Sequence, residues 1–313
     1  MTSVIFMGTP EFSVPVLEGL IENNYEIKAV VTQPDKKVGR KQKITKSPAK
    51  VAAEKHNLPI YQPAKLSGSD EMQELIDMHA DLIVTAAYGQ FLPTKFLNSV
   101  KIAAVNVHGS LLPKYRGGAP IQYSLINGDA ETGITIMEMV KKMDAGDIYA
   151  QEAIKIQPDD NAGTLFDKLS ILGSKMIIKV LPYIINGTNK RIKQNENEIT
   201  YAYNITREEE HILFNKSTRD VYNHIRGLYP WPVGYATLDD KKVKIYSSKI
   251  GTSTKYGEAG EIINIYNDAI GVKTLDGEIL ITELQFEGKK RVFVKDYLNG
   301  LHDKKSIIGK KFI

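Results

Sequence analysis

The chain has 313 residues, of which 42% are hydrophobic and 25% are charged, as is usual for a soluble globular protein of about two domains. It contains no cysteine, which excludes disulfides and thiolate metal sites and fits a reducing compartment, so we expect no metal site. No window approaches the roughly 18 apolar residues of a membrane span, and the first apolar run, Val4 to Met7, is too short for a signal peptide. We therefore expect a cytoplasmic protein without a membrane partner. The net charge of +4 is mild, so the distribution of charge is more informative than its total.

The amino-terminal half predicts an α/β fold with a Rossmann-like, mostly parallel sheet, because short apolar runs alternate with helical patterns. The expected strands are 4–7, 27–32, 60–61, 82–87 and 102–107, and the expected helices are 12–22, 48–56 and 69–79. Ser47 and Pro48 suit the N-cap and the first turn of the second helix. The opening strand and helix lack the G-x-G-x-x-G pattern, so a dinucleotide site is not expected.

The strand at 102–107 leads into a loop rich in glycine and proline, and it places two polar residues at its carboxyl end. Asn106 and His108 are two residues apart, so their side chains point to the same face of the strand. Ligands of open parallel sheets bind at this edge. The amide and the imidazole can both donate hydrogen bonds, and together they can hold the oxyanion of a tetrahedral intermediate.

A second apolar strand, 134–139, precedes Asp144, which can bring a carboxylate beside that pair and orient the imidazole. No nucleophile accompanies the three residues, because cysteine is absent and Ser110 lacks the spacing of a nucleophile elbow. The set therefore favours direct transfer of an acyl group to an amine. The alternative interpretation is structural, with His108 as an ordinary loop histidine and Asn106 as a turn cap.

The segment from Lys36 to Lys50 carries seven basic residues and no acidic one. Gly39 and its polar neighbours argue against a rigid element there. Two interpretations stay open, a solvated surface loop or a loop that neutralises several phosphates of a nucleic acid.

The carboxyl-terminal part changes character after a long helix predicted over 164–185. We expect a catalytic domain at 1–188, a polar linker at 189–205 and a second, smaller domain at 206–313. Thr206 and Glu209 have the spacing of a capping box at the start of a short helix. Regularly spaced short strands then predict an OB-like β-barrel, a fold that often binds nucleic acids; they are 235–238, 243–248, 260–266, 269–274 and 278–285.

Long motifs then identify a resemblance. The run N-V-H-G-S-L-L-P-K-Y-R-G-G at 106–118 and D-A-G-D at 144–147 resemble the folate-dependent formyltransferases. The segments 6–12, 32–35 and 87–93 are similar to the members of this family that act on methionyl-tRNA. The resemblance covers nearly the whole chain in order.

The resemblance implies transfer of the formyl group of 10-formyltetrahydrofolate to the α-amino group of methionine on initiator tRNA, a step of translation initiation. Folate would be a cosubstrate, with no permanently bound cofactor, and a monomer is expected. The implied catalytic residues are Asn106, His108 and Asp144. The implied folate-binding residues are Tyr88, Gly89, Gln90, Ser110, Leu111, Leu112 and Pro113, and the implied tRNA-binding residues are Arg40, Lys41 and Lys43.

Three other functions stay open from the residues alone. The acceptor can instead be a small amine, such as a sugar nucleotide or glycinamide ribonucleotide. The chain can also be a formyl-folate hydrolase, or an RNA-binding protein without catalytic activity. The basic loop and the barrel argue against a small acceptor, and the Asn–His–Asp set argues against a protein without activity.

Overall fold

The computed structural model describes residues 1–39 and 42–313. These residues form two compact units. The first comprises Met1–Pro120, Thr132–Ile154 and Phe166–Tyr203, and the second comprises Ile121–Glu131, Lys155–Leu165 and Asn204–Ile313. The domain boundaries expected from the sequence stay a prediction.

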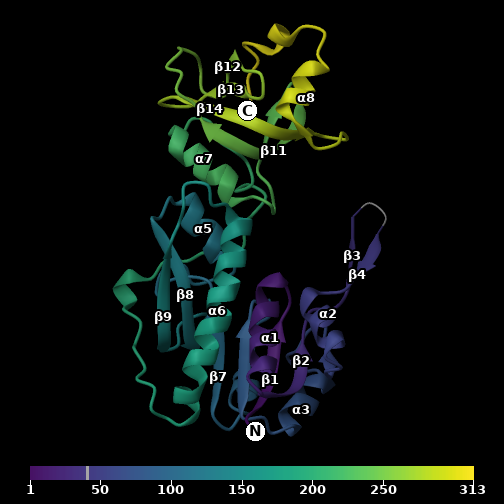
Figure 1. Cartoon of the computed structure of the whole chain (residues 1–313), viewed down its shortest axis with the longest axis vertical. Coiled ribbons are helices and arrows are strands. Elements are labelled where there is room, and N and C mark those ends of the chain that lie inside the picture. Colours follow the sequence, from purple (N-terminus) through teal and green to yellow (C-terminus); the bar gives the residue numbers. More distant parts are fainter. Residues whose placement is uncertain (40–41) are drawn as a thin grey trace. The chain divides into compact units, whose positions relative to one another are not determined.

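A seven-stranded sheet in the order β5-β2-β1-β6-β7-β8-β9 forms the centre of the first unit (Figure 1). Neighbouring strands from β5 to β7 are parallel, and β8 runs antiparallel to β7. The strands are β1 (Ser3–Gly8), β2 (Glu26–Val31), β5 (Ile60–Tyr61), β6 (Leu82–Ala86), β7 (Ala103–His108), β8 (Glu131–Glu138) and β9 (Ile148–Lys155). The predicted Rossmann-like, mostly parallel sheet is therefore confirmed.

The central strands are apolar on both sides because helices cover both faces of a parallel sheet. All six residues of β1 and all five of β6 are buried. Up to residue 203 the helical elements are η1 (Glu11–Ser13), α1 (Val14–Glu22), α2 (Pro48–Lys55), α3 (Asp70–Asp77), α4 (Thr94–Leu97), α5 (Pro120–Ile126), α6 (Ala162–Ile185) and η2 (Glu196–Glu198). Of these, α5 from Ile121 onward and the start of α6 belong to the second unit. As predicted, Ser47 caps α2, where its hydroxyl accepts from the backbone N–H of Lys50 at 3.1 Å.

Close packing brings α6 onto β7, the strand that carries Asn106 and His108. A Cβ atom at Gly173 of α6 would lie only 2.7 Å from Cγ1 of Val107. A Cβ at Gly19 of α1 would lie 2.5 Å from the Ser174 hydroxyl of α6. Both glycines let these elements approach closely, so the strand that bears the candidate site is fixed by its neighbours.

An antiparallel sheet forms the second unit, in the order β10-β11-β14-β13-β12 with β15 paired to β14. It curls into a half-barrel around a buried cluster of mainly aliphatic side chains, which confirms the predicted OB-like fold class. The elements are α7 (Thr218–Gly227), β10 (Tyr235–Leu238), β11 (Lys241–Ile250), β12 (Ile262–Ile265), β13 (Ile270–Lys273), β14 (Glu278–Phe286), β15 (Val292–Phe293), α8 (Val294–Asn299) and η3 (Lys304–Ile307).

Two local expectations were wrong. The basic segment contains a hairpin of β3 (Lys36–Val38) and β4 (Lys43–Thr45), where a loop without a rigid element was expected. The two strands are joined by backbone pairing, in which Lys37 lies opposite Ile44. Ile44 is 64% exposed, so burial of apolar side chains does not explain this hairpin. Thr206 and Glu209 exchange both bonds of a capping box, but the chain forms a turn there and does not continue as a helix.

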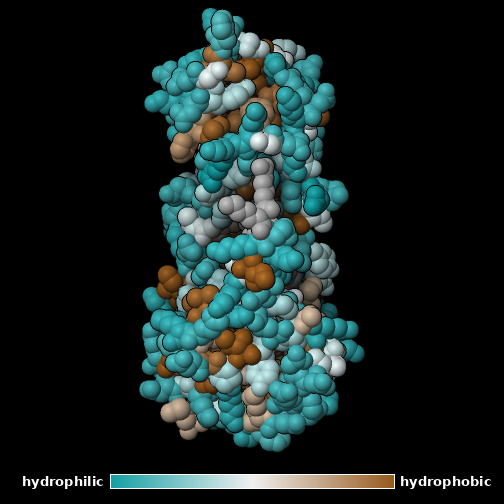
Figure 2. Space-filling model, turned by 90° about the vertical axis from the view of Figure 1, so that its right-hand side faces the viewer, coloured by the Kyte–Doolittle hydropathy of each residue, from teal (hydrophilic) through white to brown (hydrophobic). Residues whose placement is uncertain are grey.

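The surface on the side of the β3–β4 hairpin is mainly hydrophilic, and its hydrophobic side chains gather only in small groups (Figure 2). Among the described residues, no helix is both long enough and apolar enough to span a bilayer.

Candidate active site

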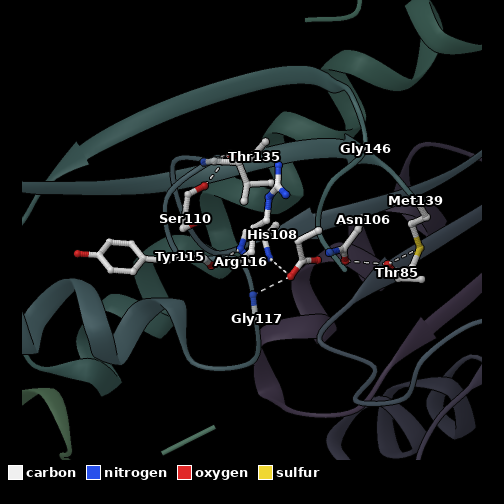
Figure 3. A network of polar contacts seen from close by, with 12 residues as sticks. Thr85, Asn106, His108, Ser110, Tyr115, Arg116, Gly117, Thr135, Met139 and Gly146 are labelled. Atoms are coloured by element: carbon white, nitrogen blue, oxygen red, sulfur yellow. Dashed lines mark hydrogen bonds and ion pairs between the residues drawn. The ribbon is translucent and has the colours of Figure 1, made fainter. Parts of the chain in front are cut away.

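The candidate site forms at the carboxyl end of β7, where Asn106 lies opposite Thr85 of β6 (Figure 3). The Thr85 hydroxyl is 2.7 Å from Oδ1 of Asn106, closer than to its two other acceptors, Val105 O and Met139 Sδ, both at 3.3 Å. Because a hydroxyl has one proton, this bond is the preferred one. No residue that the structure describes accepts a hydrogen bond from Nδ2 of Asn106, so this donor is available to a ligand.

His108 is buried, with 5% of its surface exposed, and its two ring nitrogens face different groups. Nε2 lies 3.0 Å from the carbonyl oxygen of Tyr115. A carbonyl only accepts, so Nε2 carries a proton and the neutral ring leaves Nδ1 unprotonated. Nδ1 lies 3.8 Å from Oδ2 of Asp144, within reach of an ion pair but too far for a hydrogen bond.

Asp144 comes from the loop after β8, and the structure brings it beside His108 as the sequence suggested. Its backbone has φ +46, in the left-handed region that costs energy for a residue with a side chain. The backbone N–H of Gly117 donates to its Oδ2 at 2.9 Å, which holds the carboxylate in place next to the imidazole. Asp144 therefore lies next to His108 at the end of β7 that also carries Asn106, and the catalytic roles of the three residues stay a prediction.

The predicted folate loop, Ser110 to Pro113, is organised by Thr135 of β8. The Thr135 hydroxyl donates to the carbonyl of Ser110 at 2.6 Å and accepts from the backbone N–H of Leu112 at 3.1 Å. The Ser110 hydroxyl donates to Lys114 O at 2.7 Å, so this proton is already engaged within the loop. Leu112 is buried, while Leu111 and Pro113 are half-buried. Leu111 and Pro113 thus retain apolar surface for a ligand, and Ser110 supports the loop.

The other predicted folate segment, Tyr88 to Gln90, follows β6 at the same edge of the sheet. The side chain of Gln90 holds the preceding loop, because its Oε1 accepts from the backbone N–H of Leu66 at 2.9 Å. Gly89 has φ +88 and no atom closer than 3.9 Å to a Cβ built there. Burial raises the pKa of Tyr88 to about 12, so its phenol stays neutral, and its hydroxyl has no partner among the described residues.

Of the predicted tRNA contacts, Arg40 and Lys41 lie outside the described residues. Lys43 is exposed on β4. Two further basic residues of the segment are already neutralised, since Lys46 pairs with Glu54 and Lys50 with Asp35, each at 2.8 Å. A hydrogen bond from Lys50 holds the pKa of Asp35 below its ordinary value. Of the basic residues that the structure describes in this segment, those on the hairpin are therefore the ones whose charge is available to phosphates.

Sequence reasoning missed Thr85, Arg116 and Gln194. Thr85 had one signal, since it is the single polar residue of the buried strand β6. Arg116 lies inside the long motif but without a distinguishing pattern, and its side chain is 1% exposed. Gln194 carried no signal, because the polar segment around it was expected to be a linker.

The site combines an amide, an imidazole and a carboxylate at the carboxyl edge of a Rossmann-like sheet, and none of the three is a nucleophile. This combination fits a transferase that moves an acyl group directly between its substrates. Two family models match the chain. One, described as formyl transferase, covers residues 1–181, and the other, described as formyl transferase, C-terminal domain, covers residues 204–302.

Two relatives show which kind of formyltransferase this chain resembles. A methionyl-tRNA formyltransferase of Lactobacillus acidophilus is 61% identical over 100% of this chain and 99% of its own length. That of Staphylococcus aureus strain N315 is 52% identical over 100% of both chains. The chain therefore belongs to the methionyl-tRNA formyltransferase family and is an enzyme.

Solved structures share the fold at lower identity. An N-formyltransferase from Helicobacter canadensis, in complex with folinic acid and dTDP-3-aminofucose, has a TM-score of 0.70 at 21% identity, covering 90% of this chain and 99% of that one. HypX from Aquifex aeolicus, in complex with tetrahydrofolic acid, has a TM-score of 0.66 at 15% identity, covering 94% of this chain and 46% of that one. Both support the fold.

Proposed function

We propose that this enzyme transfers the formyl group of 10-formyltetrahydrofolate to the α-amino group of methionine carried by initiator tRNA. The observation that carries the proposal is the meeting of Asn106, His108 and Asp144 at the carboxyl end of β7. The identity of 52–61% to methionyl-tRNA formyltransferases over the whole chain supports this choice of substrates.

In the proposed reaction the free amine attacks the formyl carbon, and a C–N bond forms while the carbonyl oxygen becomes an oxyanion. Nδ2 of Asn106 donates to that oxyanion. A protonated His108 adds an N–H on Nδ1, because Nε2 already donates to Tyr115 O, and the neighbouring carboxylate of Asp144 stabilises the imidazolium.

The intermediate then collapses. The bond between the formyl carbon and N10 of the folate breaks, and the proton lost by the attacking amine is transferred to N10 with the help of Asp144 and His108. Formyl-methionine on tRNA and tetrahydrofolate result. No enzyme atom becomes covalently bound, which agrees with the Ser110 proton being engaged by Lys114 O.

We propose the folate contacts at 88–90 and 110–113 and phosphate contacts from Arg40, Lys41 and Lys43. The apolar surfaces of Leu111 and Pro113 and the open backbone at Gly89 support the first set. For the second set, the support is the exposed basic hairpin around Lys43. We further expect a monomer that acts in the cytoplasm, where translation starts.

The decisive assay mixes the purified enzyme with 10-formyltetrahydrofolate and methionine-charged initiator tRNA. Formyl-methionine on the tRNA is expected. The runner-up acceptor is a small amine, because the fold is shared with an enzyme solved with dTDP-3-aminofucose. Transfer to that amino sugar but not to charged tRNA would refute the proposal, and folate release without any acceptor would indicate a hydrolase.

A further inference from the structure

Residues 191–203 belong to the first unit and pair with the loop that follows β7. Ile192 exchanges two backbone hydrogen bonds with Ile148 of β9, at 2.8 and 2.9 Å. Further along, the backbone N–H of Arg116 donates to Thr200 O at 2.9 Å, and that of Ala202 donates to Arg116 O at 2.8 Å. The segment therefore runs alongside the loop that contains Gly117, the donor to Asp144.

Gln194 of this segment connects that loop to the turn that bears Asp144. Its Oε1 accepts from Nε and Nη2 of Arg116 at 3.0 and 2.7 Å. Its Nε2 donates to the carbonyls of Asp144 and Gly146, both at 2.8 Å. Guanidinium groups only donate and carbonyls only accept, so the amide orientation is unambiguous and all four of its hydrogen-bonding positions are used.

The turn needs such support. Asp144 has φ +46, a backbone conformation that L-residues adopt at an energetic cost. Gly146 approaches β8 so closely that a Cβ would lie 1.9 Å from Glu138 O. A strained turn persists only when its surroundings determine it, and Gln194 supplies two of the contacts that do so.

Arg116 makes the connection rigid. Its side chain is 1% exposed, and its guanidinium bonds only to Gln194 in the part of the chain that the structure describes, with Nη1 left without a partner. Removing the only acceptor of a buried charge is costly, so Gln194 is held in one position.

We propose that Gln194 is a positioning residue that acts through Asp144, holding the carboxylate beside His108 for the transfer step. The inference rests on the proposed function, since it assumes that Asp144 takes part in the chemistry. The amide of Gln194 has no hydrogen-bonding position left for either substrate, because all four are already engaged.

Two substitutions separate positioning from folding. Gln194→Glu keeps acceptors for Arg116 but loses both donors to the turn, so we expect a melting temperature within a few degrees of the parent. Gln194→Met loses the donors and also the acceptor of Arg116 without adding a charge, so its melting temperature should fall further than that of Gln194→Glu, and its rates are measured below the melting transition. Because a shift on the order of 1 Å can cost about 10²-fold in rate, we expect both to slow single-turnover transfer by about ten- to a hundredfold. Affinities for folate and tRNA should stay within about threefold.

Asn195→Asp is the matched control. It makes the same amide-to-acid change at the next residue, whose side chain caps η2 and contacts no proposed catalytic residue. It should transfer at the parent rate.

A double-mutant cycle supplies the readout that a merely structural role would not produce. If Gln194 acts through Asp144, then Gln194→Met should cost less than about threefold in an Asp144→Asn background, and both single variants should change the pH–rate profile in the same way. Independent, multiplying effects would overturn the proposal, as would a parental rate for Gln194→Met. If Asp144→Asn itself transfers at the parent rate, the proposed role of Asp144 fails instead, so the two failures are distinguishable.

Discussion

The hydrogen bond from Thr85 to Asn106 allows a graded test of oxyanion stabilisation. Asn106→Ala removes the amide altogether. Asn106→Asp keeps an oxygen for the Thr85 hydroxyl at the 2.7 Å position but replaces the free Nδ2 donor with an oxygen. Thr85→Val leaves the amide in place and removes only the group that orients it.

The expected magnitudes differ in a fixed order. Loss of one oxyanion donor costs about 10²–10³ in turnover, or roughly 2.7–4 kcal/mol, so Asn106→Ala should lie in this range. Asn106→Asp should be at least as slow, because it places a negative oxygen where charge develops. A hydrogen bond contributes about 1 kcal/mol, so Thr85→Val should lose only the orientation preference and slow transfer by roughly two- to tenfold.

The assay is a single-turnover measurement at saturating folate and charged tRNA, which isolates the chemical step from binding. Melting temperature and tRNA affinity serve as controls for folding. An Asn106→Ala enzyme within threefold of the parent would refute the donor role. A Thr85→Val enzyme as slow as Asn106→Ala would show that Thr85 does more than orient the amide.

Four further predictions concern charge. Asp144→Asn should slow transfer and alter its pH–rate profile, since it keeps the shape and removes the negative charge; an unchanged profile would leave a structural turn residue. Neutralising the hairpin residues should weaken tRNA binding and flatten the slope of log affinity against log salt, with folate binding unaffected; the residues are Arg40, Lys41 and Lys43. Changing the barrel residues Lys241, Lys242 and Lys244 should also reduce affinity but preserve transfer at saturation. Hydrogen bonds from Ser3 hold the pKa of Asp81 below its ordinary value, so its stabilising effect is present above about pH 4 and is lost as pH falls through the lowered pKa. The melting-temperature deficit of Asp81→Asn at pH 7 should therefore narrow toward pH 3.

The sequence predicts well wherever a local physical rule decides the outcome. Ser47 caps its helix because a short side-chain acceptor satisfies the first backbone N–H groups. The strands of the first sheet follow from apolar runs, and the placement of Asn106 and His108 follows from the period of a strand. These rules need no knowledge of distant parts of the chain.

Contacts between distant residues could not be predicted in the same way. Gln90 occurs in a motif that implies folate binding, yet its amide closes a loop with Leu66. The hairpin of β3 and β4 forms by backbone pairing, and those of its side chains that the structure describes are exposed and thus give no alternating pattern of burial. Polarity around Gln194 indicates exposure, but it cannot indicate which backbone carbonyls its amide meets.

Asp144 shows why the catalytic set depends on such contacts. β8 runs antiparallel to β7, so His108 lies opposite Thr135, and Val105, three residues before His108, lies opposite Glu138 at the far end of β8. The chain therefore leaves β8 travelling away from the edge that carries the site, and the following loop must fold back to present its carboxylate. The hydrogen bond from Glu138 N to Asp147 O at 2.9 Å and the close approach of Gly146 to Glu138 hold this loop in its folded-back position. The position of Asp144 on it is then set by Gly117 on one side and by Gln194 on the other. The strand period sets the positions of Asn106 and His108 locally. Asp144, by contrast, is placed by tertiary contacts from a residue fifty positions later in the chain. Substitutions at positions remote in sequence should therefore displace the carboxylate more than the amide or the imidazole.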